Sequence, residues 1–151
     1  MSVSMASAEL VALHSNLLGR LEIRADTVIS FPAGLPGFVA LRNFALVETQ
    51  REDLVWLQSV DDADVTFLLA DPFAAVTGFE VEIPTADLAT LGSSSGSEES
   101  LLVLAVAQLE GGRPTTANLQ SPIVIDRERR VGRQVVLPDS RYGMHHPISI
   151  A

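Results

Sequence analysis

Apolar residues recur at every second position in parts of this chain. In residues 79–83, Phe, Val and Ile alternate strictly with two glutamates, which is the pattern of a strand with one face in the core and one face in water. Residues 21–24 repeat this alternation on a shorter scale. Both segments are therefore predicted to be β-strands.

A second set of segments consists of short apolar runs between charged or turn-forming residues. Their length and their β-branched and aromatic content favour strands over helices. Residues 101–109 form the most apolar segment and are predicted to be the central strand, and the charged residues 126–130 are predicted to form a turn. The strands predicted from this set are residues 44–47, 54–57, 65–69, 101–109, 123–125 and 134–137.

Helical pattern is weak in this sequence. Thr85, directly after Pro84, is predicted to cap a short helix over residues 86–91. Residues 10–18 are predicted to form either a short helix or a frayed extension. Helices are therefore expected to contribute little to the fold.

The spacing of the predicted strands indicates the fold class. Many short strands at intervals of about ten residues, with turn-forming residues between them, are typical of a sandwich or barrel. We predict an all-β (mainly β) fold, a compact antiparallel β-barrel-like single domain with one or two short helices. Residues 1–18 are assigned to a partly flexible N-terminal extension and residues 19–151 to the β domain.

Length and composition narrow the classes of protein. A chain of 151 residues is long enough for one domain with a core of its own. It contains no Cys, which excludes a disulfide framework, a thiol nucleophile and a thiolate metal site. Residues 1–16 have no basic stretch, so they make a poor signal peptide. The apolar run 101–107 is too short to span a bilayer, and we expect a cytoplasmic protein with no membrane contact.

The charge of the chain is negative and unevenly distributed. Its formal net charge is −9, and all ten of its basic residues are Arg. Residues 1–110 hold sixteen carboxylates against four Arg. A surface dominated by carboxylates repels nucleic-acid phosphates and attracts basic partners, so we expect no direct nucleic-acid binding; a role in solubility alone is the alternative. The one basic stretch is expected to be a solvated turn or to pair with carboxylates, and it comprises Arg127, Arg129, Arg130 and Arg133.

Four aspartates near the middle of the chain are candidates for a binding surface. Asp61, Asp62 and Asp64 lie between two predicted strands, in what we expect to be a tight turn, and Asp71 follows the next strand. Hydrogen bonding to the backbone of its own turn is the favoured interpretation for any one of them. As a group they could instead present a negative patch to a basic protein, whereas the D-x-[DN]-x-[DN]-G pattern of a calcium loop is absent.

Phe73 and Asn118 are two further candidates. Phe73 puts an aromatic ring two residues after Asp71, the mixture expected at a protein-binding edge, and a place in the core is an equally good interpretation. Asn118 lies in a predicted loop before Pro122. Because Asn tolerates left-handed backbone and bonds nearby backbone groups, a structural role is favoured for it.

Residue types used in catalysis are present without a recognisable pattern. His145 and His146 would point to opposite faces of a strand, which makes them a poor chelating pair. Asp139, Ser140 and His145 supply the residue types of a hydrolase triad, but the G-x-S-x-G elbow is absent. The chain also lacks a phosphate-binding P-loop and a dinucleotide fingerprint. We predict no catalytic residues, no metal site and no cofactor.

Several motifs in a fixed order resemble one protein family. The first is the loop of residues 31–38, where Phe31 and Phe38 bracket two prolines and two glycines, a composition that specifies one turn shape. The others are residues 57–62, 116–125 and 139–142, followed by His146–Pro147. In this order they resemble the flagellar assembly factor FliW over residues 19–147, nearly the whole chain.

The resemblance to FliW implies a fold and a function. It implies a compact, mostly antiparallel β-barrel-like fold and a non-enzymatic protein that binds the translational regulator CsrA, relieves its repression of flagellin mRNA, and also binds flagellin. Flagellin then competes for the protein and releases CsrA. Alternatives are a flagellin-binding chaperone without CsrA control and a small metal-dependent hydrolase. Our candidates for the protein-binding surface are Asp61, Asp62, Asp64, Asp71, Phe73, Asn118, Asp139 and Ser140.

Overall fold

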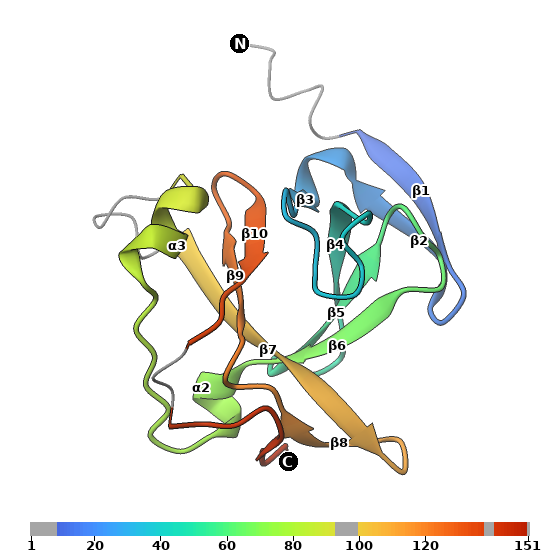
Figure 1. Cartoon of the computed structure of the whole chain (residues 1–151). Coiled ribbons are helices and arrows are strands. Elements are labelled where there is room, and N and C mark those ends of the chain that lie inside the picture. Colours follow the sequence, from blue (N-terminus) through green and yellow to red (C-terminus); the bar gives the residue numbers. More distant parts are fainter. Residues whose placement is uncertain (1–8, 93–99, 138–140, 151) are drawn as a thin grey trace.

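Strands are the main regular elements of the structure. The computed structural model describes residues 9–92, 100–137 and 141–150 (Figure 1). Its strands are β1 (Leu10–Ser15), β2 (Gly19–Arg24), β3 (Val28–Ser30), β4 (Asn43–Glu48), β5 (Leu54–Ser59), β6 (Thr66–Ala70), β7 (Leu101–Glu110), β8 (Arg113–Ala117), β9 (Ile123–Asp126), β10 (Val131–Gln134) and β11 (His146–Pro147). Its helices are the short 3-10 turn η1 (Ala25–Thr27), α2 (Pro72–Ala75) and α3 (Thr85–Thr90).

Seven of the strands close into a barrel. The order β7-β6-β5-β4-β3-β10-β9 returns to its start, because β9 also pairs with β7. Neighbouring strands run antiparallel at every step except β3–β10, a parallel pair joined at Ser30 and Val131. The prediction of an all-β, compact antiparallel β-barrel-like fold is therefore confirmed, with one parallel contact, between β3 and β10.

Strand β7 connects the parts of the sheet. Its first four residues pair with β9, Ala105 and Val106 pair with β6, and its last four residues pair with β8. β8 in turn pairs with β11, so these two strands extend the sheet beyond the barrel (Figure 1). The prediction that residues 101–109 form a strand is confirmed, but β7 is not the middle strand of the sheet order; it is the strand that joins the barrel to β8.

The main core lies inside the barrel. Phe31, Phe44 and Leu57 are fully buried, and the rings of Phe31 and Phe44 meet edge to face with centroids 5.2 Å apart. Burying a side chain of this size stabilises the fold by about 1.5–3 kcal/mol. A smaller cluster packs Ala75 of α2 and Phe79 against β7 and β8. The loop after β3 begins at Phe31, and because this residue is in the core, it fixes the position of the loop on the barrel.

Two of the predicted strands are wrong in part or in whole. Residues 79–83 keep the expected alternation of burial but lie outside every strand of the described structure. The Glu80 amide instead donates to Tyr142 Oη at 3.3 Å. The strand predicted at 134–137 is displaced, because β10 ends at Gln134. Alternating burial therefore indicates extended backbone packed on a core, and it does not show that the segment pairs with another strand.

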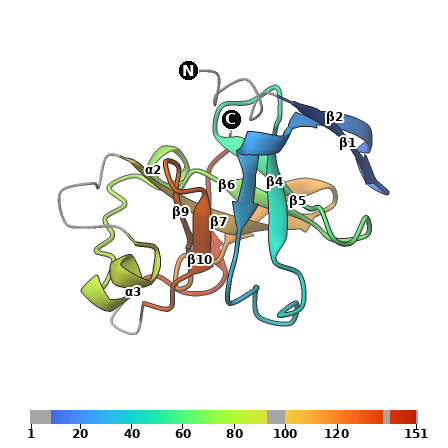
Figure 2. The ribbon, with the colours of Figure 1, turned by 90° about the horizontal axis from the view of Figure 1, so that it is seen from above.

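The segment at residues 10–18 is neither a short helix nor a frayed extension. β1 pairs with β2 over its whole length in a separate two-stranded sheet that lies beside the barrel (Figure 2). Leu13 and Ser15 are buried whereas His14 is exposed, which is the alternation of a strand with one covered face. The division between residues 1–18 and 19–151 stays a prediction.

The remaining differences have local causes. Helix α3 forms as predicted, but Thr85 is its first residue and the preceding Pro84 provides no side-chain cap. β8 escaped prediction because it contains Pro114, which the sheet accommodates at a register shift beside Gln108 and Leu109. Among the described residues, no helix is long and apolar enough to cross a membrane.

Candidate functional site

The predicted aspartates lie at opposite ends of β6. Asp61, Asp62 and Asp64 occupy the turn that precedes β6, which we call the acidic turn. Asp71 follows β6 directly as the N-cap of α2, and with Phe73 it forms what we call the α2 end. A five-residue strand spans about 17 Å. One side chain of a partner therefore cannot contact both groups.

Asp61 holds the acidic turn to the neighbouring chain. Its Oδ2 accepts hydrogen bonds from the amides of Arg42 and Asn43, both at 3.0 Å, and its Oδ1 accepts from Asn43 Nδ2 at 3.4 Å. Desolvation, the largest single influence, raises the pKa of Asp61, but the three hydrogen bonds together lower the pKa below its usual value. The role of Asp61 in the fold is therefore structural, but its partners are Arg42 and Asn43, so the favoured interpretation that it bonds the backbone of its own turn is wrong for this residue.

Asp62 and Asp64 remain exposed while they shape the turn. Asp62 Oδ1 accepts from the Asp64 amide at 2.9 Å, and the Asp64 carboxylate accepts from the side-chain amide of Asn16. Ser59 Oγ accepts from the amides of Asp61 and Asp62 at 3.0 and 2.9 Å. Within the described ranges, none of the three aspartates forms an ion pair. The acidic turn thus keeps its negative charge at the surface.

The loop of residues 31–41 lies beside the acidic turn. Gly34 has φ +65°, and a Cβ at this position would lie 2.6 Å from Val39 Cα, so the loop closes tightly on itself. The Phe38 ring packs edge to face on Phe67 with centroids 5.6 Å apart. Phe38 and Val39 nevertheless stay 38% and 64% exposed. The motif therefore builds a fixed loop with an apolar tip.

The α2 end exposes an aromatic ring. Asp71 Oδ1 accepts from the Phe73 amide at 3.0 Å, and Pro72 occupies the first turn of the helix, both favourable at a helix start. Phe73 is 56% exposed and meets Phe79 edge to face at a centroid distance of 5.0 Å. Of the two interpretations of Phe73, the place in the core is wrong, and the protein-binding edge stays a prediction.

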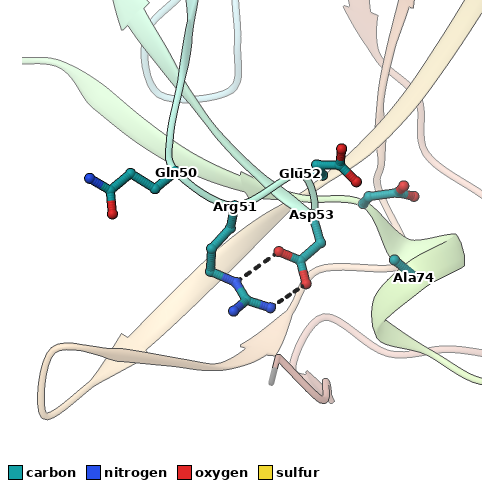
Figure 3. Close-up of a pocket in the computed structure, with 6 residues that line it drawn as sticks. Gln50, Arg51, Glu52, Asp53 and Ala74 are labelled. Atoms are coloured by element: carbon teal, nitrogen blue, oxygen red, sulfur yellow. Dashed lines mark hydrogen bonds and ion pairs between the residues drawn. The ribbon is translucent and has the colours of Figure 1, made fainter.

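A shallow pocket of about 450 Å³ adjoins Asp71. Arg51 holds Asp53 with two hydrogen bonds, from Nε to Oδ1 at 2.9 Å and from Nη2 to Oδ2 at 2.8 Å. The Arg51 hydrogen bond outweighs desolvation and lowers the pKa of Asp53 below its usual value. Part of the negative charge here is therefore already paired. The pocket lies between the β4–β5 turn and α2 (Figure 3), and its lining residues are Gln50, Arg51, Glu52, Asp53, Asp71 and Ala74.

A series of rings continues from the α2 end to the C-terminal segment. Tyr142 lies between Phe79 and His146, with ring centroids 5.1 and 5.2 Å away. The Arg141 guanidinium lies 5.3 Å from the centroid of the Tyr142 ring and donates to Glu80 Oε1 at 3.0 Å. These contacts hold residues 141–150 against the barrel.

The remaining predicted site residue that the structure describes, Asn118, belongs to neither surface. Asn118 Oδ1 accepts from the Ser121 amide at 3.1 Å, so the expected structural role is confirmed. Asp139 and Ser140 lie outside the described residues. His146 belongs to the ring series. In the part of the chain that the structure describes, no three His, Asp or Glu side chains are grouped so that they could hold a metal ion.

The basic stretch pairs with carboxylates of its own chain at two positions. Arg129 Nη1 lies 3.3 Å from the buried Asp126, and Arg133 Nε lies 3.0 Å from Asp87. The interpretation of this stretch as a partner for carboxylates of the same protein is confirmed for these two residues.

Sequence reasoning missed the apolar loop tip and the paired charges of the pocket. The composition of residues 31–38 indicated a fixed turn, but the exposure of Phe38 depends on Phe67, which is far away in sequence. The run Arg51-Glu52-Asp53 offered a signal, since Arg and Asp two residues apart in a tight turn can form a bidentate pair.

Known proteins match this chain along almost its whole length. A family model described as FliW protein matches residues 12–148. The flagellar assembly factor FliW of Thermosipho africanus is 32% identical over 139 residues, which cover 90% of this chain and 94% of that protein. The FliW of Symbiobacterium thermophilum is 40% identical over 126 residues, covering 82% and 90%. A crystal structure of the flagellar assembly factor FliW has a TM-score of 0.82 and 28% identity, covering 91% of this chain and 96% of that one. Because sequence and fold agree over the same extent, the chain belongs to the FliW family of flagellar assembly factors.

Proposed function

We propose that this protein is a non-enzymatic, cytoplasmic flagellar assembly factor that works by binding two other proteins. One is the translational regulator CsrA, whose repression of flagellin mRNA it relieves. The other is flagellin, which competes for the protein and so releases CsrA. The observation that carries the proposal is the match to the FliW family over residues 12–148.

The charge of the chain supports a basic partner. A regulator that binds RNA needs a basic surface for the phosphates, and such a surface is attracted to a protein with a formal net charge of −9. The acidic turn supplies exposed carboxylates at one place on the surface. Bound near the RNA site of the regulator, these carboxylates oppose phosphate binding.

Five of the proposed contact residues fall on two surfaces, the acidic turn and the α2 end. Asp62 and Asp64 are exposed at the acidic turn and mainly raise the association rate. Asp61 contributes by holding that turn in place. Phe73 offers apolar contact at the α2 end, next to Asp71. Further proposed contributors are Asn118, Asp139 and Ser140.

Calorimetric titration against the CsrA of its own host tests the proposal. We expect binding that disappears once the protein is saturated with flagellin. A filter-binding assay should then show that the protein releases RNA from CsrA. Binding to neither partner would refute the proposal, and CsrA binding undiminished by flagellin would refute the partner switch. Flagellin binding without CsrA binding would leave a flagellin-binding chaperone.

Metal analysis of the purified protein addresses the remaining alternative. A metal-dependent hydrolase would carry bound metal in a fixed ratio to the chain. We expect no stoichiometric metal and no change in CsrA binding after treatment with a chelator. Stoichiometric metal that supports hydrolysis would contradict a non-enzymatic role.

A further inference from the structure

The loop between β3 and β4 carries apolar side chains into solvent. Val39 is 64% exposed and Phe38 is 38% exposed at its tip. Val60, which follows β5, is 36% exposed, and its amide donates to Asn43 O at 2.8 Å where β4 begins. Figure 2 shows the loop extending beyond the ends of β3 and β4. Exposed apolar residues gathered in this way mark interaction surfaces.

The loop tip is held in place by contacts within the chain. The Phe31 amide donates to Arg42 O at 2.7 Å, and the Phe38 amide donates to Leu35 O at 2.7 Å. The Gly34 backbone leaves no room for a side chain beside Val39. A surface already fixed in its bound shape loses little conformational entropy on association. The loop is therefore suited to contact a partner without rearrangement.

The acidic turn forms the rim of this apolar tip. Asp61 accepts from the amides of Arg42 and Asn43, directly after the loop. Arg42 Nε in turn lies 3.5 Å from Val39 O. With Asp62 and Asp64 on the same turn, the carboxylates outnumber the Arg beside them three to one. The patch is thus apolar at its centre and negative at its rim.

We propose that the tip of the 31–41 loop and the acidic turn form one docking surface for the basic, RNA-binding regulator. Val39 and Phe38 fill an apolar site on the regulator, while Asp62 and Asp64 face its Arg and Lys side chains. The inference rests on the proposed function and assigns its regulator-binding surface. The apolar contact beside the acidic turn is thereby assigned to Val39 and Phe38, because Phe73 lies at the other end of β6.

Charge favours a basic protein as the partner at this surface over RNA and over a second copy of the chain. RNA itself would bring phosphates against the carboxylates of the rim. A second copy of the chain in a twofold interface centred here would bring the same carboxylates together. A basic protein surface with an apolar centre complements both parts of the patch.

The apolar part is tested by Val39→Ser in the full chain. Val136→Ser is its matched control, because Val136 is 62% exposed and lies after β10. Val60→Ser tests the same patch from outside the loop. We expect V39S to bind the host CsrA about tenfold more weakly, V60S to weaken binding in the same direction, and V136S to bind as the unaltered protein does. Thermal unfolding checks that all three variants fold.

The charged part is tested by the double variant Asp62→Asn and Asp64→Asn. Asn keeps an oxygen that can accept the hydrogen bonds of both carboxylates, so the turn should keep its shape. We expect the association rate of this variant to depend less steeply on salt, while V39S keeps the slope of the unaltered protein. The control removes the same charge elsewhere, at the exposed Glu82 and Glu128, as E82Q with E128Q.

Each outcome has one meaning. Equal CsrA binding by V39S and V136S would overturn the docking surface and leave the proposed function standing. Loss of flagellin binding by V39S with CsrA binding intact would overturn the choice of the basic regulator as the occupant. Unaltered protein that binds neither partner would refute the proposed function and with it this inference.

Discussion

The two ends of β6 carry similar residues. At each end a solvent-exposed Phe meets an inner ring edge to face: Phe38 meets Phe67 at 5.6 Å, and Phe73 meets Phe79 at 5.0 Å. Each end also carries aspartates that accept hydrogen bonds from nearby backbone amides. On residue types alone, both would be assigned the same kind of contact.

The two ends differ in how their charges are satisfied. Asp62 and Asp64 accept hydrogen bonds from uncharged amides, which leaves their negative charge at the surface. At the α2 end, Asp71 also accepts from an uncharged amide, but the neighbouring Asp53 is held by Arg51, and such a pair has little net field at a distance. A count of charged residues treats these carboxylates alike, but only carboxylates without a paired cation attract a distant basic partner. We therefore assign charge-guided contacts to the acidic turn and chiefly apolar contacts to the α2 end.

The largest effect is expected from removing the ring of Phe31, the buried residue at which the loop beside the acidic turn begins. Phe31→Ala deletes a fully buried ring and should lower the unfolding free energy by about 3–5 kcal/mol. Phe73→Ala deletes an exposed ring and should cost about 0.5–1.5 kcal/mol, the value of its ring pair. Urea unfolding followed by the fluorescence of Trp56 measures both. Equal losses would contradict the contrast between the ends.

A smaller effect tests how tightly the loop closes. Gly34→Ala places a Cβ against the Val39 backbone and should cost about 1–3 kcal/mol from overpacking, in addition to strain at φ +65°. Gly37→Ala is the matched control, since Gly37 has φ +84° with open space around it, and it should cost about 1 kcal/mol from strain alone. Thermal unfolding compares the two. A G34A protein as stable as G37A would show that the loop has room to relax.

Asp61→Asn separates the structural aspartate from its exposed neighbours. The Asn oxygen can still accept from both backbone amides, but these bonds lose the charge of the carboxylate and the new NH2 faces the side-chain NH2 of Asn43. The unfolding free energy should therefore fall by about 1 kcal/mol at neutral pH. Because the pKa of Asp61 is lowered in the folded state, its carboxylate stabilises the fold above the usual Asp pKa of about 3.9. This contribution is lost as the pH falls through the lowered value. The stability gap between the unaltered protein and D61N should therefore narrow in acid.

Asp62→Asn is the matched control for that experiment. It retains an oxygen for the Asp64 amide and should change stability little at any pH. Urea unfolding at neutral pH and in acid gives the comparison for both variants. A gap for D61N that stays constant between the two pH values would show that ionisation of Asp61 does not stabilise the turn.

Local pattern was sufficient for most of the barrel. The apolar runs of β7 and β9 have the length and the β-branched content that favour strands, so their sequence alone predicts strands. The pattern failed where pairing depends on distant segments. Residues 79–83 have the alternation of a strand but lie against Tyr142 instead of a ladder. β8 forms despite Pro114, because a register shift there accommodates it.

The candidate site was less predictable than the fold. Residue types singled out Asp61 and Phe73 correctly as members of surface segments. Their grouping failed because β6 separates them by about 17 Å. The structural role of Asp61 depends on the amides of Arg42 and Asn43, which no spacing within the turn reveals. The exposed Val39 was overlooked because a Pro- and Gly-rich motif indicates backbone shape and says nothing about which side chains face water.

The smallest effect is expected from a substitution that makes the charges at the two ends of β6 more alike. Arg51→Gln removes the cation that neutralises Asp53 near the α2 end. The pKa of Asp53 should rise towards its usual value, because the Arg51 hydrogen bond is the largest influence that lowers it. NMR titration of the carboxyl groups measures this shift. The freed charge should also raise the association rate with a basic partner by less than about twofold at low salt. An Asp53 pKa that does not move, or a slower association, would show that neutralisation by Arg51 is not what distinguishes the α2 end from the acidic turn.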